Sequence, residues 1–143
     1  MLKTHLSPDG RSGYVEFFNG RLNRTQYSDW AHLPGVVDLA ISVRVRDRSG
    51  TNPTLVPTVE TCEEGEEPVY RWTIVDGDTE GDLTRTTAPT VEGKIQSAGS
   101  YSGIIHGGMA SLVRLKFTLG GTSPDFNVIA RGHFQCRSPN WAS

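Results

Sequence analysis

The fold is decided by a stretch in which apolar and polar residues alternate: Val37-Asp38-Leu39-Ala40-Ile41-Ser42-Val43-Arg44-Val45-Arg46. Successive side chains of a β-strand point to opposite faces of its sheet, so a period of two indicates a strand with one buried face. We expect the apolar members, from Val37 to Val45, to face a core. Arg44 and Arg46 should then face solvent.

Further strands are expected on both sides of this stretch, at 14–18, 54–62, 69–75, 101–105, 112–119 and 126–134. Pro57 cannot donate a backbone hydrogen bond, which places it on an edge strand or at a bulge. No segment sustains the apolar spacing of a helix, and 16 glycines and eight prolines punctuate the chain. Short alternating strands separated by turn residues predict an all-β fold, an antiparallel β-sandwich of jelly-roll or immunoglobulin-like topology.

The 143 residues correspond to one domain with flanking segments. We divide them into an extended N-terminal arm with a possible short strand (1–35), a β-sandwich domain (36–136) and a C-terminal tail (137–143). The arm and the tail are the expected contact elements. Deleting residues 1–30 is therefore expected to leave the sandwich folded and to abolish association.

Charge and hydropathy exclude some classes of partner. The net charge is −2, so direct binding of nucleic acid is not expected. No apolar run approaches the 18 residues of a membrane span. Residues 60–82 hold nine acids and one arginine, a net charge of −8, which leaves +6 for the rest of the chain. This stretch is either a solvated pair of loops or an edge that meets basic residues of another subunit.

Two turns repeat one pattern. Gly50-Thr51-Asn52-Pro53-Thr54-Leu55 and Gly121-Thr122-Ser123-Pro124-Asp125-Phe126 each follow one expected strand and precede another. Glycine permits a positive φ, Asn or Ser caps a turn with its side chain, and proline fixes φ near −65°. We expect two similar hairpins at the same end of the sandwich.

Together these motifs resemble a group of tailed-phage virion proteins. The shared pattern is carried by Leu39–Val45, Gly50–Leu55, Val56–Thr61, Ala98-Gly99-Ser100-Tyr101, Val113–Leu119, Gly120–Phe126 and Val128–Ala130. It covers residues 37–134, and the chain departs from it at 60–82 and 83–97. The resemblance implies a structural protein of the capsid or tail, often a decoration or minor head protein.

Candidate chemistry is sparse. Alternating carboxylates at Asp76, Asp78, Glu80 and Asp82 offer oxygen ligands for calcium, although an acidic hairpin turn is the preferred interpretation. The four histidines are far apart, and no nucleophile elbow or phosphate loop occurs. Cys62 and Cys136 end two expected strands and could approach each other, but reduced thiols are the expectation. We expect no enzyme activity and no cofactor.

The expected function is structural: a capsid decoration protein that cross-links neighbouring subunits of a phage shell, assembled in the host cytoplasm. Its partners would be the major capsid protein or other virion proteins, together with copies of itself in a homo-oligomer, with a trimer as the favoured form. The chosen anchors for partner binding are Arg21, Arg24, Trp30 and Trp141. A tail or neck component, a carbohydrate-binding module with exposed aromatic residues, and an accessory domain without a partner remain alternatives.

Overall fold

A computed structural model describes residues 2–63, 70–73, 84–86, 95–106 and 110–136. Within these ranges the regular structure is all β and antiparallel, which confirms the expected fold class. No helix among the described residues has the length and apolarity to cross a membrane. The strands are β1 (Lys3–Leu6), β2 (Ser12–Leu22), β3 (Gln26–Tyr27), β4 (Ala31–His32), β5 (Val36–Cys62), β6 (Tyr70–Thr73), β7 (Thr84–Thr86), β8 (Gly99–His106) and β9 (Leu112–Cys136).

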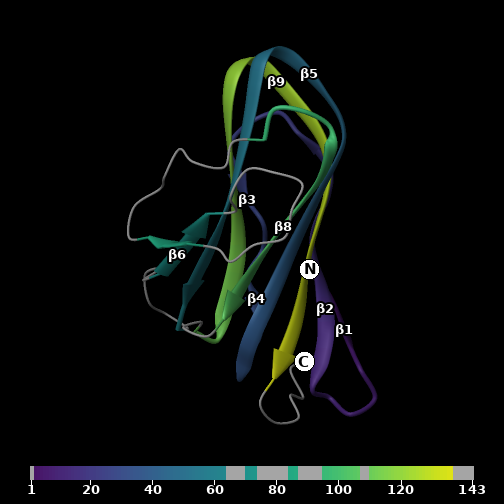
Figure 1. The fold of residues 1–143 in the computed structure, drawn as a ribbon, viewed down its shortest axis with the longest axis vertical. Coiled ribbons are helices and arrows are strands. Elements are labelled where there is room, and N and C mark those ends of the chain that lie inside the picture. The colour runs from purple at the N-terminus through teal and green to yellow at the C-terminus, as the bar shows by residue number, and fades with distance from the viewer. Residues whose placement is uncertain (1, 64–69, 74–83, 87–94, 107–109, 137–143) are drawn as a thin grey trace.

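The centre of the fold is a ribbon made of the two longest strands. β5 and β9 pair from Val36–Cys136 at one end of the register to Cys62–Leu112 at the other. Figure 1 shows both strands rising to the top of the view, turning over together and descending. The ribbon is therefore folded onto itself, and its two halves lie in different layers.

The fold in the ribbon lies at the two repeated motifs, where Thr51 pairs with Thr122. Gly50 and Gly121 have φ of 113° and 93°, and a Cβ added at Gly50 would lie 2.6 Å from the carbonyl oxygen of Ser123. Such positions favour glycine, because any other residue would have a strained backbone and its side chain would overlap the backbone of the opposite motif. The motifs share one end of the sandwich, as expected. They differ from the expected local hairpins, because each strand continues through its motif into the other layer.

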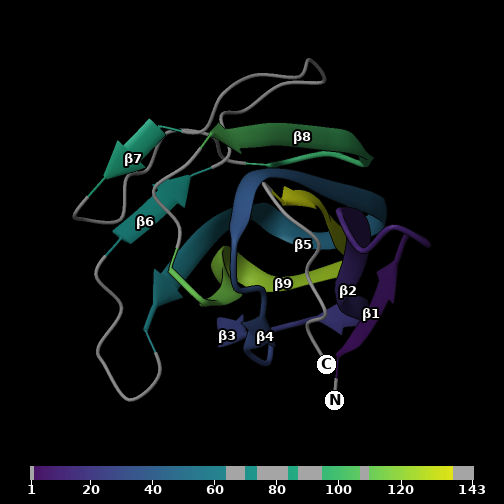
Figure 2. The ribbon, with the colours of Figure 1, turned by 90° about the horizontal axis from the view of Figure 1, so that it is seen from below.

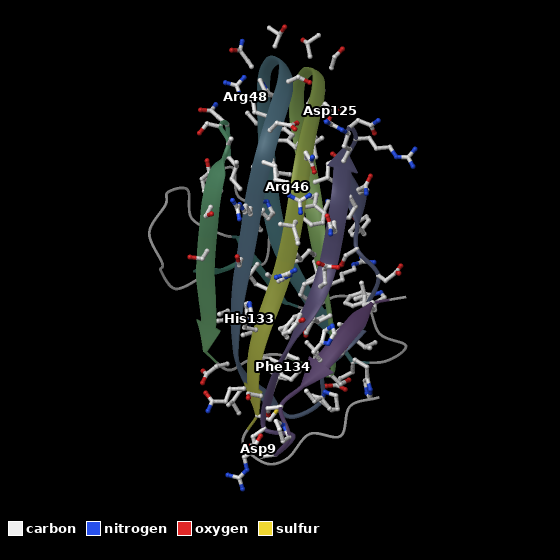
Figure 3. The ribbon with its side chains drawn as sticks, turned by 90° about the vertical axis from the view of Figure 1, so that its right-hand side faces the viewer. Asp9, Arg46, Arg48, Asp125, His133 and Phe134 are labelled. Atoms are coloured by element: carbon white, nitrogen blue, oxygen red, sulfur yellow. The ribbon has the colours of Figure 1, made fainter. Side chains whose placement is uncertain are left out.

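Two layers result. Layer A consists of β1, β2, residues 125–136 of β9, residues 36–49 of β5, and β8, in that order. Layer B consists of β3 and β4 beside residues 112–120 of β9, then residues 54–62 of β5, β6 and β7. In Figure 2, β1 and β2 lie on the right and β8 at the top, whereas β3 and β4 lie below and β6 and β7 on the left. Figure 3 shows the outer side of layer A with its strands side by side.

The core lies between the layers and follows the expected alternation. Layer A contributes Leu39, Ile41, Val43 and Val45, and layer B contributes Val113, Leu115 and Phe117, all buried. Val37 is only half-buried, because the register between β5 and β9 shifts between Val36 and Asp38. Pro57 lies within β5 opposite Phe117 of β9, and because the residues that follow Thr73 of β6 lie outside the described ranges, its expected position at an edge or a bulge stays a prediction.

The N-terminal segment contributes more regular structure than one short strand. The strand expected at 14–18 is the middle of β2, which pairs with β9 inside layer A through ten of its 11 residues, with a register shift between Glu16 and Phe18. Val15, Phe17 and Leu22 of β2 are buried in the core, and β3 and β4 extend layer B. The sequence of this segment is polar and lacks a regular period, so it did not predict β3, β4 or the full length of β2. Only a few apolar residues attach the segment to the core. The tail 137–143 lies outside the described residues.

Candidate interaction surface

The predicted anchor residues lie at different places. Arg21 is near the end of β2 and Arg24 lies between β2 and β3, both exposed, while Trp30 lies half-buried between β3 and β4. Trp141 and the calcium candidates Asp76, Asp78, Glu80 and Asp82 lie outside the described residues. Within the described ranges, no three His, Cys, Asp or Glu side chains are grouped so that they could hold a metal ion.

Arg21 connects three strands at the folded end of the ribbon. Its Nη1 atom donates to Asp125 Oδ1 at 2.8 Å and to Asp47 Oδ1 at 3.3 Å. The hydrogen bond that Arg21 donates to Asp125, together with the charge of Asp47, raises the pKa of the Arg21 guanidinium. Asp125 is visible near the upper end of layer A in Figure 3. Arg21 thus joins β2 to β5 and β9, and its role as a partner anchor stays a prediction.

Trp30 belongs to a cluster of aromatic and basic residues on the outer face of layer B, which we call the Tyr27 cluster: Tyr27, Trp30, Glu60, Arg114 and Lys116. The guanidinium carbon of Arg114 lies 4.0 Å from the centre of the Tyr27 ring and 4.3 Å from that of Trp30. Lys116 Nζ lies 5.5 Å from the Tyr27 ring centre. These are distances at which a cation is attracted to an aromatic face.

Glu60 fixes the position of Arg114. The two residues are opposite each other in the β5–β9 register, and the alternation of β5 and β9 places both on the outer face of layer B. Arg114 Nε and Nη2 each lie 2.9 Å from Glu60 Oε1. Glu60 is only 2% exposed, so this ion pair is much less screened by solvent than a surface pair.

The backbone around Ser28 fixes the two aromatic residues. Ser28 N–H donates to the carbonyl oxygen of Leu115 at 2.8 Å, and Leu115 N–H donates to Ser28 Oγ at 2.9 Å. The hydroxyl of Ser28 also donates to the carbonyl oxygen of Asp29 at 2.9 Å. The segment between β3 and β4 is thereby attached to β9 where the strand pairing is interrupted. Tyr27 and Trp30 are consequently presented on a fixed backbone.

Tyr27 stands out by its exposure. It is 47% exposed, and it is the large hydrophobic side chain that the described part of the chain leaves most open to solvent. Tyr, Trp and Arg are the residue types enriched among those that dominate protein–protein binding energy. A half-open aromatic ring beside an oriented guanidinium is therefore suited to contact a partner. The sequence pointed to Trp30 but not to Tyr27, Arg114 and Lys116. The available signal was that Arg114 and Lys116 alternate with the apolar residues of 112–119 and should therefore share the outer face of that strand.

The outer face of layer A carries a second aromatic contact, in which Tyr14 lies between two histidines. The His5 and Tyr14 rings are stacked with centres 4.5 Å apart, and the Tyr14 and His133 rings are 5.6 Å apart. Arg131 lies 5.7 Å from the Tyr14 ring centre. Tyr14 is half-buried, and its contacts with three neighbours make it a suitable comparison residue for Tyr27.

The two cysteines end β5 and β9, away from the folded end of the ribbon. Cys62 lies opposite Leu112 in layer B, whereas Cys136 lies opposite Val36 in layer A. Both thiols are buried. Burial restricts the access of reagents, which is typical of structural rather than reactive cysteines.

Comparison with models of known protein families, and with characterised proteins by sequence, gives no match. Among solved structures, the fold is similar to the SPBc2 prophage-derived protein YomS, with a TM-score of 0.48, 10% identity, and coverage of 86% of this chain and 91% of that one. It is also similar to a protein of infectious bursal disease virus strain Gx (TM-score 0.43, 10% identity, 88% of this chain). A third is VP2 of the subviral particle of that virus (TM-score 0.30, 15% identity, 95% of this chain). This chain spans 36% and 41% of the two bursal disease virus proteins.

Proposed function

We propose that the protein is a structural component of a virus particle that decorates the shell and binds it through the Tyr27 cluster. The single observation that carries the proposal is the half-exposed ring of Tyr27, held beside Arg114 on a layer of paired strands. The likeness of the strand and turn motifs to tailed-phage virion proteins supports the same class of function.

Fixed geometry favours binding because less conformational freedom is lost on association. Arg114 is oriented by Glu60 before any partner arrives, and the backbone at Ser28 is already bonded to β9. The partner surface should offer an apolar recess for the Tyr27 ring and an acidic group near Lys116. Repeated contacts across a shell would add avidity, so a modest affinity for each site suffices to cross-link neighbouring subunits.

The carbohydrate-binding alternative is less well supported by this geometry. Sugar recognition by an aromatic platform needs open ring faces, and the Arg114 guanidinium lies over both Tyr27 and Trp30. Binding to sugar is therefore tested as the outcome that would replace this proposal.

The test is co-sedimentation of the purified full chain with particles of the virus that encodes it, prepared without this protein. Tyr27→Ala should weaken binding at least tenfold, since a hot-spot tyrosine contributes about 2 kcal/mol or more and about 1.4 kcal/mol corresponds to a factor of ten. Lys116→Glu should also weaken binding, because it reverses the charge that faces the acidic group of the partner. Tyr14→Ala is the matched control, because it removes an aromatic ring with a cation contact from the other layer. It should leave binding unchanged.

Failure of the unmodified chain to bind the particles would overturn the virion role. Unchanged binding of Tyr27→Ala and Lys116→Glu would overturn the assignment of the surface. Binding to a glycan array that Tyr27→Ala abolishes would replace the proposal by the carbohydrate-binding alternative.

A further inference from the structure

One edge of layer A is long and uncharged. β8 pairs with β5 through all eight of its residues, from Gly99 opposite Val45 to His106 opposite Asp38, without a register shift. Its other edge pairs with no strand of the described chain. In Figure 3, β8 is the outermost strand on the left of layer A.

The remaining edge strands of the described chain differ from β8. β1 has four residues and includes Lys3, β7 has three and includes Arg85, and β3 and β4 have two residues each. Short or charged edges are how soluble proteins avoid pairing with other chains. β8 contains no Pro, Asp, Glu, Lys or Arg and has no bulge, so this protection is absent there.

β8 is also firmly held in place. Tyr101, Gly103 and Ile105 are buried on the inner side of layer A. The hydroxyl of Tyr101 donates to the carbonyl oxygen of Ser97 at 2.9 Å. The backbone groups along the edge of β8 that pairs with no described strand are thus already in the extended geometry that an added strand requires.

We propose that β8 pairs antiparallel with β8 of a second copy of this chain, with Ser102 opposite Ser102. This register places Tyr101 opposite Gly103, Ile104 opposite Ser100, and Ile105 opposite Gly99. Each large residue therefore stands opposite a small one. Residues opposite each other in an antiparallel pair share a face of the sheet, and an aromatic residue opposite a glycine is a favourable cross-strand pair.

This complementarity identifies the occupant as a second copy. The same eight residues supply both the large and the small positions, so the strand fits its own reversed sequence. The absence of charge means that no like-charged pair forms when the strand meets itself. The two layers A then form one continuous sheet around a two-fold axis at Ser102, and such an isologous contact closes at two copies. This inference is independent of the proposed shell binding, and it favours a dimer over the trimer expected from the sequence.

The first experiment measures the mass of the full chain by sedimentation equilibrium. The unmodified protein should have twice the mass of one chain, and Ser102→Lys should have half that value, because two lysines would face each other at the axis. Ser42→Lys is the matched control: Ser42 lies opposite Ser102 on the neighbouring strand β5, one strand in from the edge. It should remain a dimer, with both variants showing the far-ultraviolet circular dichroism of the parent.

A second variant pair tests the register. Ser102→Cys should form a disulfide-linked dimer under mild oxidation, whereas Ser100→Cys, which stands opposite Ile104, should not. A monomer or a trimer of the unmodified chain would overturn the proposal. So would a dimer that survives Ser102→Lys, or one that Ser42→Lys disrupts equally. Stronger cross-linking through Ser100→Cys than through Ser102→Cys would overturn the register.

Discussion

Gly121 and Gly35 both have left-handed backbone, but they differ in their surroundings. Gly121 has φ of 93° and a Cβ there would overlap the backbone of Asn52, whereas Gly35 has φ of 77° and nothing within 4 Å. Gly35→Ala isolates the conformational cost, about 1 kcal/mol. Gly121→Ala adds overlap with backbone that cannot move aside, and should lower the free energy of unfolding by about 3 kcal/mol. Urea denaturation measures the free energy of unfolding of both variants. Equal losses would contradict the close contact between the two motifs where β5 and β9 turn over.

Arg114 and Glu60 form the ion pair on which the Tyr27 cluster rests. The Glu60 side chain is 3% exposed and that of Arg114 is 22% exposed. Arg114→Met takes the guanidinium away from the buried charge of Glu60, so it should lower the free energy of unfolding by about 3 kcal/mol. Adding Glu60→Gln removes that charge and should recover part of the loss. Chemical denaturation of both variants tests this, and a double variant less stable than Arg114→Met would contradict it.

β2 is the element whose role changes most between sequence and structure. It lies between β1 and β9 in layer A, and its residues Val15, Phe17 and Leu22 are buried. Deleting residues 1–30 should therefore unfold the protein, in contrast to the expectation of a dispensable arm. Deleting residues 1–6 removes only the edge strand β1 and should leave a folded domain. Circular dichroism and thermal unfolding distinguish the two deletions. A cooperative unfolding transition in the variant that lacks residues 1–30 would support the original expectation of an arm outside the folded domain.

The alternation of apolar residues was sufficient to predict the strands that form the core. Alternate residues of both stretches are buried as the period of two required, because each stretch has one face on the core and one on the outside. The buried residues are Leu39, Ile41, Val43, Val45, Val113, Leu115 and Phe117. The length of β5 and β9 could not be predicted in the same way. A Gly-Thr-Asn-Pro sequence fits a hairpin as well as a corner, and pairing with the other motif decides between them.

The candidate surface was predicted only in part. Trp30 was chosen as one of the anchors, but the sequence around it gave no reason to single out Tyr27. Their association with Arg114 depends on the register of β3 and β4 against β9, which joins segments far apart in the sequence. Such long-range register is invisible to a local pattern of residues.

At the scale of the whole molecule, the folded ribbon makes the two layers interdependent. β5 and β9 each run through both layers, and the segment between β2 and β3 also passes from layer A to layer B. A layer that unfolded alone would expose the inner face of the other and would break the ribbon at its corner. We therefore expect one cooperative transition rather than a stepwise loss of layers.

Native-state hydrogen exchange provides the test of this coupling. Val43 is buried in layer A, and Val43→Ala should lower the free energy of unfolding by about 2 kcal/mol. If the layers unfold together, the most protected amides of Val113 and Leu115, in layer B, should lose the same amount of protection as those of layer A. Ser49→Ala, at an exposed position of the same strand, should change neither. A loss confined to layer A would mean that the corner is a hinge between two independently stable sheets.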